Sequence, residues 1–580
     1  MRAMASSFRL SFTKPGTRKD AAEALPRSAA LRRRDAGDTT RNRLVIAMVA
    51  FVAVYGTIAG RLVQFGLSTP ADAVALGSAQ SAIAASRPDI VDRNGQILAT
   101  DIKTASLYAE PRRIVDPDEA TELLATVFPD LGTDAVRQKL ASKAGFVWLK
   151  REITAGQQEA VHKLGLPGVG FLTESRRFYP SGRSVGYVVG HTNVDNQGIA
   201  GIEKYVDDQW LGDLHQLGFA MTPNLEPVKL SLDLSVQHVL HDELSSAMEK
   251  YTALAAAGIV MNVKTGEIVG LSSLPDYDPN NPVEALQPDR MNRITASVFE
   301  MGSTFKLFAT AMALDSGKVK MTDSFDASVP LRVGGFTIND FHGKHRVLTV
   351  PEIFIYSSNI GTGREALKVG QQGQQEFLKR MGLMDKPPTE LPEVAGPILP
   401  KRWSDLVTIT VSFGHGISVS PLATAMAASA VMNGGHLIPP TFFPRSEDEA
   451  RLKAKRVLSP QTSEEMRYLM RLNALKGSGS RANIPGYRVG GKTGTAEKVV
   501  NGRYSSNKRF NAFLASFPID DPQYLVLIVI DEPNPEKPGM AATSGLNAAP
   551  TAGNVISRIA PMLGVMPRFD EVDLPLLASY

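Results

Sequence analysis

The sequence of 580 residues predicts an α/β protein with a β-rich domain ahead of the α/β domain and one apolar helix near the N-terminus. A chain of this length exceeds what one hydrophobic core usually organises, so two or more domains are expected. From Val228 onward, apolar runs typical of strands alternate with segments of helical periodicity. The sequence therefore predicts a first folded domain at 67–228, an α/β domain at 229–566 and a tail at 567–580.

The composition excludes several classes of protein. The apolar fraction of 43% and the charged fraction of 21% are ordinary for globular proteins. The net charge of +4 is small for this length and gives no reason to expect a nucleic-acid partner. Cysteine is absent, which excludes disulfides, thiolate metal sites and cysteine nucleophiles. No other metal-ligand spacing is present, so we expect neither a metal nor a cofactor.

The first 66 residues predict a basic arm and a membrane anchor. Residues 1–43 carry eleven Lys or Arg against four Asp or Glu and lack periodicity, which is typical of a disordered arm. Residues 44–60 contain no charge and would form about 26 Å of helix, close to a hydrocarbon core of roughly 30 Å. A buried helix and a cleavable signal peptide are alternatives, but the long arm favours an uncleaved anchor at 44–66. The basic arm places the N-terminus in the cytoplasm.

The α/β domain is predicted from its apolar patterns. Expected strands are 229–233, 257–263, 267–271, 511–517 and 524–533, and expected helices are 234–251 and 549–563. Two helical stretches and a proline-rich connection are expected between residues 357 and 492.

Ser303 and Lys306 are the first candidates for catalysis. If a helix begins near Thr304, their spacing puts the amine on the same face as the hydroxyl, one turn along. A lysine can take the proton of a serine only if burial or a neighbouring cation makes the lysine neutral. An isolated Ser-x-x-Lys is common, however, and most often lies on a solvated helix face.

Two further motifs follow in order. Residues 357–359 read Ser-Ser-Asn, and residues 492–495 read Lys-Thr-Gly-Thr after two glycines. Each motif is weak alone, but the three together, separated by tens and then by more than a hundred residues, are specific. With them the chain resembles the penicillin-recognising serine acyltransferases, which comprise penicillin-binding proteins and serine β-lactamases.

Motifs in the region at 67–228 restrict the resemblance to one class of penicillin-binding proteins. Residues 87–99 predict two strands joined by an Asn-Gly turn, and they are similar to the R-G-x-I-x-D-R-N-G-x-x-L-A motif of class B penicillin-binding proteins, with Pro88 in place of glycine. Residues 177–180 match R-x-Y-P, and residues 201–203 match G-x-E. In class B proteins this region is a pedestal for the catalytic domain. The resemblance implies a structural role for three buried polar residues: Arg93, Arg177 and Glu203.

The resemblance implies a penicillin-binding transpeptidase (serine β-lactamase-like) domain, with a five-stranded antiparallel sheet, flanking helices and a cleft against an all-helical lobe. It implies a serine-type peptidoglycan D,D-transpeptidase that cross-links stem peptides ending in D-Ala-D-Ala and is acylated by β-lactams. The expected catalytic residues are Ser303 as nucleophile, Lys306 as its base, Ser357 as proton relay and Lys492 as the cation that keeps Lys306 neutral. The expected substrate-binding residues are Asn359, Thr493, Gly494 and Thr495, with an oxyanion hole from the backbone N–H groups of Ser303 and Thr495.

Several alternatives stay open. A membrane-anchored β-lactamase would need a carboxylate or a carboxylated lysine over the acyl ester, and no E-x-x-x-N motif in an omega-type loop is evident after the Ser357–Asn359 motif. A β-lactam sensor or an inactive scaffold would not need the intact motif set. His415, in a glycine-rich loop, could be a base, but Lys306 fills that role, so we interpret the histidine as structural. The pedestal length and residues 276–282 favour the division type over the elongation type.

The resemblance also implies partners and a location. The region at 67–228 is too short for a glycosyltransferase beside a pedestal, so the enzyme is expected to depend on a separate membrane glycan polymerase of the FtsW type and on other division proteins. We expect a single-pass protein of the cell inner membrane with a periplasmic catalytic domain.

Overall fold

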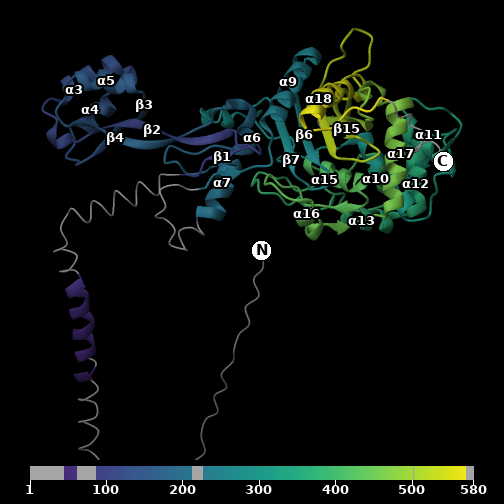
Figure 1. The fold of residues 1–580 in the computed structure, drawn as a ribbon, viewed down its shortest axis with the longest axis horizontal. Helices are drawn as coiled ribbons and strands as arrows, with labels where there is room; N and C mark the ends of the chain where they lie inside the picture. The colour runs from purple at the N-terminus through teal and green to yellow at the C-terminus, as the bar shows by residue number, and fades with distance from the viewer. Residues whose placement is uncertain (1–44, 47, 62–86, 212–225, 501, 570–580) are drawn as a thin grey trace, which may run out of the picture. The chain divides into compact units, whose positions relative to one another are not determined.

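The structure is a computed structural model that describes residues 45–46, 48–61, 87–211, 226–500 and 502–569 (Figure 1). It separates into one unit at 1–81 and another at 82–580. The first unit contains helical residues 48–61, whose apolar side chains, such as Phe51 and Val52, are exposed. Among the residues described, no helix combines the length and the hydropathy needed to cross a membrane. The ends of the predicted anchor at 44–66 and the whole predicted arm lie outside the described residues.

The pedestal is built on a five-stranded sheet, as its β-rich pattern predicts. Strand β2 (Ile97–Ala109) pairs with β3 (Val147–Ile153) and β4 (Val169–Phe178), while β1 (Ile90–Val91) pairs with β2 and with β5 (Val228–Lys229). The predicted Asn-Gly turn joins β1 to β2, and Gly95 has the positive φ of +84° that favours glycine. The pedestal helices are α3 (Pro117–Val127), α4 (Asp134–Leu140), α5 (Ala155–Lys163), α6 (Gly186–Val189) and α7 (Gly201–Val206).

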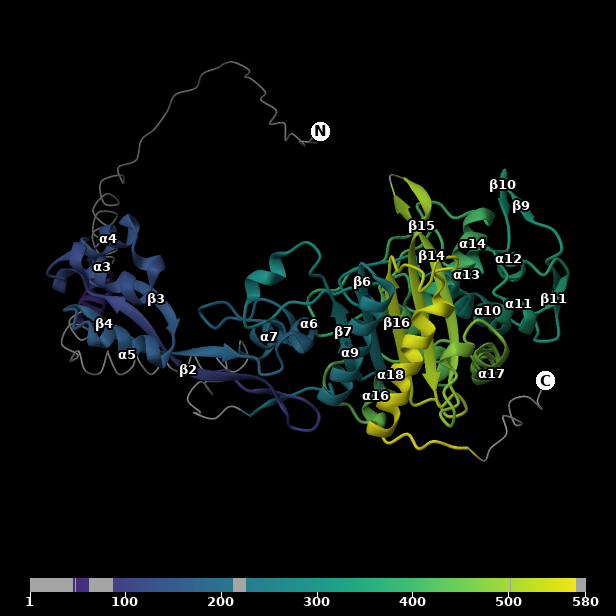
Figure 2. The ribbon, with the colours of Figure 1, turned by 90° about the horizontal axis from the view of Figure 1, so that it is seen from above.

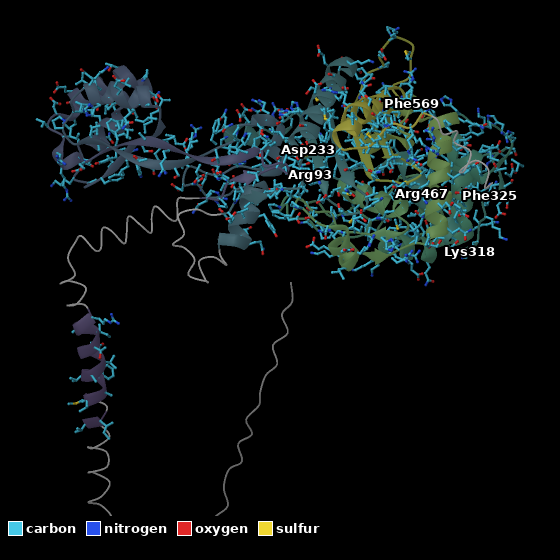
Figure 3. The ribbon with its side chains drawn as sticks, viewed as in Figure 1. Arg93, Asp233, Lys318, Phe325, Arg467 and Phe569 are labelled. Carbon is cyan, nitrogen blue, oxygen red and sulfur yellow. The ribbon has the colours of Figure 1, made fainter. Side chains whose placement is uncertain are left out.

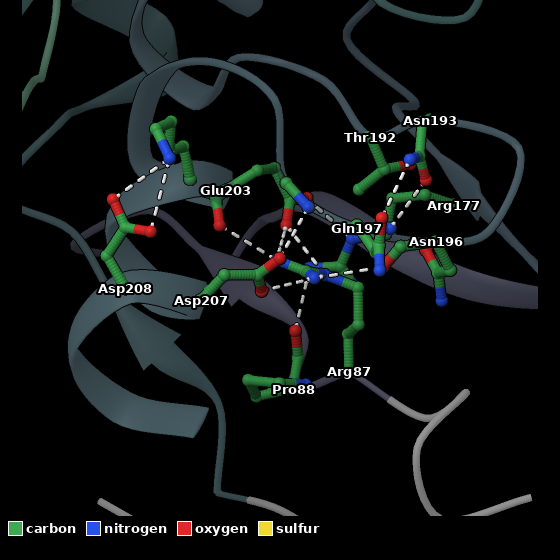
Figure 4. Close-up of polar contacts among 12 residues, drawn as sticks. Arg87, Pro88, Arg177, Thr192, Asn193, Asn196, Gln197, Glu203, Asp207 and Asp208 are labelled. Carbon is green, nitrogen blue, oxygen red and sulfur yellow. Dashed lines mark hydrogen bonds and ion pairs between the residues drawn. The ribbon is translucent and has the colours of Figure 1, made fainter. Parts of the chain in front are cut away.

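Buried charges hold the pedestal together (Figure 4). Glu203 is fully buried and accepts hydrogen bonds from Arg177 Nε at 2.6 Å and from Arg87 Nε at 3.0 Å. Arg177 also donates to Asp101 at 3.1 Å, and Arg87 forms an ion pair with Asp207. Each buried charge therefore has a hydrogen-bonded partner of opposite sign, which is the condition under which burial of charge is tolerated. The sequence resemblance anticipated Arg177 and Glu203 but not Arg87.

A second polar junction connects the pedestal to the catalytic domain. Arg93 Nη2 lies 3.4 Å from Glu267 Oε2, and Asn94 donates to Asp233 at 3.1 Å. Figure 3 shows Arg93 and Asp233 side by side at this junction. The structure thus places Arg93 where a residue that ties the two domains together is expected.

The catalytic domain contains the expected five-stranded antiparallel sheet, but the expected strand at 229–233 is wrong, because only Val228–Lys229 is a strand and it pairs with β1 in the pedestal sheet. Its strands, in spatial order, are β14 (Gly490–Val500), β15 (Arg503–Phe517), β16 (Tyr524–Asp531), β6 (Ala255–Asn262) and β7 (Ile268–Leu274). Along β16, alternate residues enter different cores: Leu527 packs with the helical lobe, and Ile528 packs with the helices on the other face. The register of β14 against β15 shifts between Glu497 and Lys498, so residues 506–508 of β15 form a bulge.

Helices cover both faces of the sheet. Figure 2 shows α9 (Leu234–Tyr251) and α18 (Ala548–Met562) together along one face, close to the predicted bounds of both helices. The expectation of two helical stretches between 357 and 492 is wrong, because that fully described segment contains six α-helices. They are α12 (Asn359–Val369), α13 (Gln371–Arg380), α14 (Asp405–Ser412), α15 (Pro421–Met432), α16 (Glu447–Lys453) and α17 (Pro460–Lys476).

The expectation of an all-helical lobe is wrong, because the lobe also contains three pairs of short strands. Strand β8 (Ser324–Asp326) pairs with β11 (Val347–Thr349), β9 (Leu331–Val333) with β10 (Phe336–Ile338), and β12 (His436–Leu437) with β13 (Lys455–Arg456). Helix α11 (Val350–Tyr356) begins at Thr349, whose side chain forms a reciprocal capping box with Glu352.

Candidate active site

Ser303 lies in a turn of 3₁₀ helix, η6 (Gly302–Phe305), which leads directly into α10 (Lys306–Asp315). Gly302 has a φ of +54°, and a Cβ atom there would lie 2.8 Å from the carbonyl oxygen of Thr495. A Cβ atom at Gly494 would lie 2.6 Å from the carbonyl oxygen of Met301. The two glycines therefore let the turn that carries the nucleophile approach β14 backbone to backbone.

Lys306 is fully buried and lies between the first two motifs. Its Nζ atom is 3.1 Å from Ser303 Oγ, 3.0 Å from Ser357 Oγ and 2.7 Å from Asn359 Oδ1. Burial, reinforced by the nearby charge of Lys492, holds the pKa of Lys306 well below its ordinary value, although Asp340 and Glu365 oppose the shift. The sequence predicts this juxtaposition, and the structure brings all four side chains together.

The hydrogen-bond partners of Lys306 are compatible with a neutral amine. The carbonyl oxygen of Ser357, 2.5 Å from Nζ, can only accept. Asn359 Oδ1 can also only accept, and its orientation is fixed because Nδ2 of the same amide donates to the carbonyl oxygen of Asn339 at 3.0 Å. A neutral amine has two N–H groups for these two acceptors, and its lone pair is then free to accept a proton from a serine hydroxyl.

Ser357 is shared by both lysines. It ends α11 in the left-handed region, with a φ of 56°, and its Oγ atom lies 3.0 Å from Lys306 Nζ and 3.0 Å from Lys492 Nζ. A non-glycine residue with positive φ is uncommon, and such positions cluster at functional sites. Burial lowers the pKa of Lys492 to about 7, and its ammonium faces the ring of Phe354 at 5.6 Å. Ser357 can therefore pass a proton between the two amines.

A cavity of about 420 Å³ opens over these residues. Alternate residues of β14 share one face of the strand, so Thr493, Thr495 and Glu497 all line this cavity. The hydroxyl of Thr493 lies 2.6 Å from that of Ser478, and the hydroxyl of Thr495 accepts from the backbone N–H of Ser544. Two hydroxyl groups on alternate residues of one strand, as at Thr493 and Thr495, can together hold a carboxylate.

Sequence reasoning missed several residues of the site. Ser478 has no motif of its own and reaches Thr493 from the loop after α17. Asp340 accepts from the Ser358 hydroxyl at 2.7 Å and from the backbone N–H of Ile360 at 2.9 Å, which anchors the start of α12. Glu365 is fully buried, accepts from Thr310 at 3.0 Å, and has its pKa raised to about 8 by burial. None of these residue types at these spacings is distinctive in a sequence.

His415 also lies in the cavity, although the sequence interpretation treated it as structural. It and Tyr504 line the cavity together with Ser303. The Nδ1 atom of His415 is 3.6 Å from Glu300 Oε2, and burial lowers the pKa of His415.

Two protein families match this chain. Residues 82–213 match the penicillin-binding protein dimerisation domain, and residues 256–557 match the penicillin-binding protein transpeptidase domain. These regions correspond to most of the pedestal and of the catalytic domain.

Individual relatives of this chain are consistent with these two family matches. The probable peptidoglycan D,D-transpeptidase FtsI of Caulobacter vibrioides is 40% identical over 512 residues, which cover 86% of this chain and 85% of the relative. The peptidoglycan D,D-transpeptidase FtsI of Escherichia coli K12 is 29% identical over 515 residues, which cover 84% and 85%. The transpeptidase domain of penicillin-binding protein 3 from Burkholderia pseudomallei is 30% identical, covers 58% of this chain and 97% of that domain, and superposes with a TM-score of 0.53. The chain therefore belongs to the class B penicillin-binding proteins and is a serine-type peptidoglycan D,D-transpeptidase.

Proposed function

We propose that Ser303 and Lys306 perform the acylation step of this transpeptidase. The neutral amine of Lys306 takes the proton of Ser303 while Oγ attacks the carbonyl carbon between the two D-alanines of a stem peptide. The 3.1 Å contact between Nζ and Oγ supports this step, because a base must lie within hydrogen-bonding reach of the proton it removes. The C–N bond then breaks and leaves an acyl ester on Ser303.

Ser357 and Lys492 complete the proton transfer. The proton on Lys306 passes through the Ser357 hydroxyl to the amine of the departing D-alanine, which restores neutral Lys306. The equal 3.0 Å distances from Ser357 Oγ to both lysines support this relay. The charge of Lys492 disfavours a second charge on Lys306, so the base is regenerated in its neutral form.

The remaining motif residues bind the donor peptide. Asn359 holds a substrate amide, and the hydroxyls of Thr493 and Thr495 bind the terminal carboxylate beside Gly494. Backbone N–H groups of Ser303 and Thr495 bind the developing oxyanion, which is usually the largest electrostatic contribution to such reactions. The cavity lined by Asn359, Thr493 and Thr495 supports this assignment.

A labelled penicillin is expected to attach covalently to Ser303 and to remain attached for minutes or longer. The measurement is mass spectrometry of the intact protein, followed by peptide mapping. Ser303→Ala should abolish labelling, whereas Ser316→Ala, at the far end of α10, should retain it. A label on another residue, or loss of the adduct within seconds as in a β-lactamase, would contradict the transpeptidase mechanism.

The same proposal includes the wider organisation of the chain. A cytoplasmic arm (1–43) precedes a transmembrane anchor (44–66), a periplasmic pedestal (67–228), the catalytic domain (229–566) and a tail (567–580). The anchor is supported by the exposed apolar side chains of the helix at 48–61, because such a surface is typical of a segment that contacts a membrane or another protein. The protein acts in the inner membrane at the division septum, as its similarity to FtsI proteins supports. Its partner is a membrane glycan polymerase of the FtsW type.

Replacing residues 44–65 with an unrelated apolar span of equal length tests whether this helix binds the proposed polymerase. Small residues such as Ala50, Ala53 and Gly56 let two helices approach closely in a membrane. Penicillin acylation should be unchanged, while co-purification with the polymerase and septation should weaken. If the exchanged protein supports normal division, the helix serves only as an anchor and the polymerase must bind elsewhere.

A further inference from the structure

A glutamate, a histidine and a tyrosine at the active-site cavity take no part in the acylation described above. Glu300 accepts from the backbone N–H of Gly416 at 2.7 Å and from the hydroxyl of Tyr504 at 3.1 and 3.2 Å. Its second oxygen lies 3.6 Å from Nδ1 of His415. The ring of His415 is held between Phe413 and Tyr504, with centroid distances of 5.7 and 5.4 Å. The histidine is therefore fixed in orientation, and a carboxylate faces one of its two nitrogens.

This arrangement favours one tautomer of His415, although Glu300 at 3.6 Å is not hydrogen bonded to Nδ1. A carboxylate beside Nδ1 favours the proton on that nitrogen, which leaves the lone pair of Nε2 free. No described residue hydrogen bonds to Nε2. Enzymes that use a histidine base orient its second nitrogen with a hydrogen-bonded carboxylate; here Glu300 supplies a facing charge at 3.6 Å without that hydrogen bond. Ser303 does not need this base, because Lys306 already contacts its hydroxyl.

The charges around His415 suit a cationic ligand. Glu300 and Glu497 both act electrostatically on His415, and Glu497 lines the cavity together with Arg509, its partner on the neighbouring strand. Lys306 opposes them with an effect smaller than that of Glu300 but larger than that of Glu497, and Tyr504 stays un-ionised because burial and Glu300 raise its pKa to about 12. The second substrate of a cross-linking enzyme is a primary amine, which is an ammonium ion near neutral pH. Two carboxylates would attract that ion, and the neutral imidazole could take its proton.

We propose that Glu300 and His415 form the acceptor-amine site of this enzyme, an inference that rests on the transpeptidase function proposed above. Glu300 and Glu497 bind the ammonium group of a second stem peptide. Nε2 of His415 takes one proton from it and later releases that proton to solvent. The resulting amine attacks the ester carbonyl, its N–C bond forms, and the bond from the carbonyl carbon to Ser303 Oγ breaks. The second proton of the nitrogen passes through Ser357 and Lys306 to Ser303 Oγ.

The test separates the two halves of the reaction. The full-length enzyme is acylated with a thioester analogue of acyl-D-alanine, and D-alanine is then added as the acceptor amine. Thiol release reports acylation, and chromatography of the amide product reports aminolysis. Because loss of a general base costs typically about 10²–10⁴-fold, His415→Asn is expected to slow amide formation by about 100-fold or more. Its acylation should change far less than its aminolysis.

Two readouts distinguish a base from a merely structural histidine. Because burial lowers the pKa of His415, its base form persists at neutral pH and is lost as the pH falls. The ratio of wild-type to His415→Asn rates should therefore shrink as the pH falls through that pKa. Glu300→Gln keeps an acceptor for Gly416 and Tyr504 but removes the charge, so it should raise the D-alanine concentration that half-saturates aminolysis.

The chain offers a matched control. His241 is also paired with a carboxylate, Asp276, at 2.7 Å, but neither residue lines the cavity. His241→Asn should leave aminolysis unchanged. Wild-type aminolysis rates and pH dependence in His415→Asn would overturn the inference. If His415→Asn fails to fold, as shown by loss of penicillin labelling, Glu300→Gln with unaltered acceptor dependence would overturn it. Failure of the wild-type enzyme to be acylated would instead contradict the proposed function.

Discussion

Lys306→Arg is expected to slow acylation of Ser303 by penicillin as severely as Lys306→Ala, by about 10²–10⁴-fold. A guanidinium group stays protonated in proteins and cannot accept the serine proton. It also cannot replace a fully buried neutral amine that fits between Ser357 and Asn359. The measurement is the second-order rate constant of acylation, followed by mass spectrometry.

Lys318→Arg is the control for this prediction. Lys318 donates a hydrogen bond to the carbonyl oxygen of Val369 and does not line the cavity. Its acylation rate should equal that of the wild type. The wild-type rate should also fall as the pH drops below the lowered pKa of Lys306, since only the neutral amine is a base. Substantial acylation by Lys306→Arg would mean that another residue, with His415 the first candidate, accepts the proton of Ser303.

Glu203→Ala is expected to lower the free energy of unfolding of the pedestal by about 3–5 kcal/mol, because removing one partner of a buried ion network leaves uncompensated charge. Both Arg87 and Arg177 would keep buried guanidinium groups without the central carboxylate. The measurement is chemical denaturation of the detergent-solubilised full chain, monitored by a probe in the pedestal.

Glu159→Ala is the matched control in the same domain, because the ion pair of Glu159 with Lys163 is exposed on both sides. Exposed pairs contribute about 0–1 kcal/mol, so this variant should unfold almost like the wild type. A loss below about 1 kcal/mol for Glu203→Ala would show that the network is not needed for stability.

The strands of the catalytic sheet could be predicted because their apolar runs are bounded by turns, as at β6, β7 and β16. Helix α15 could not be recognised as readily. All twelve of its residues are buried, and many are alanine, so no polar face marks a helical period. The intervening helices of the lobe were therefore underestimated, although strands β6, β7 and β16 and the closing helix α18 were placed closely.

Only part of the candidate site could be predicted, because some of its residues lie in local motifs and others reach the site from distant parts of the chain. Ser303, Lys306 and Lys492 lie in local motifs whose spacing is visible in the sequence. Ser478 and Asp340 reach the site through contacts between segments that are brought together only by folding. Arg87 likewise contacts Glu203 across 116 residues of chain. Long-range pairing of common residue types leaves no signal in one sequence.

The bulge in β15 has a consequence for how this enzyme can change by insertion or deletion. The register from Gly490 to Glu497 against residues 509–516 is set on the cleft side of the bulge, whereas the paired tip beyond it holds Tyr504. A one-residue slip in a strand would turn every side chain to the opposite face, but a bulge absorbs extra residues locally. Changes in tip length would therefore leave Thr493 and Thr495 facing the cavity while they reposition Tyr504. Under the proposals made above, length variation at the tip would affect the acceptor site and leave the donor site unchanged.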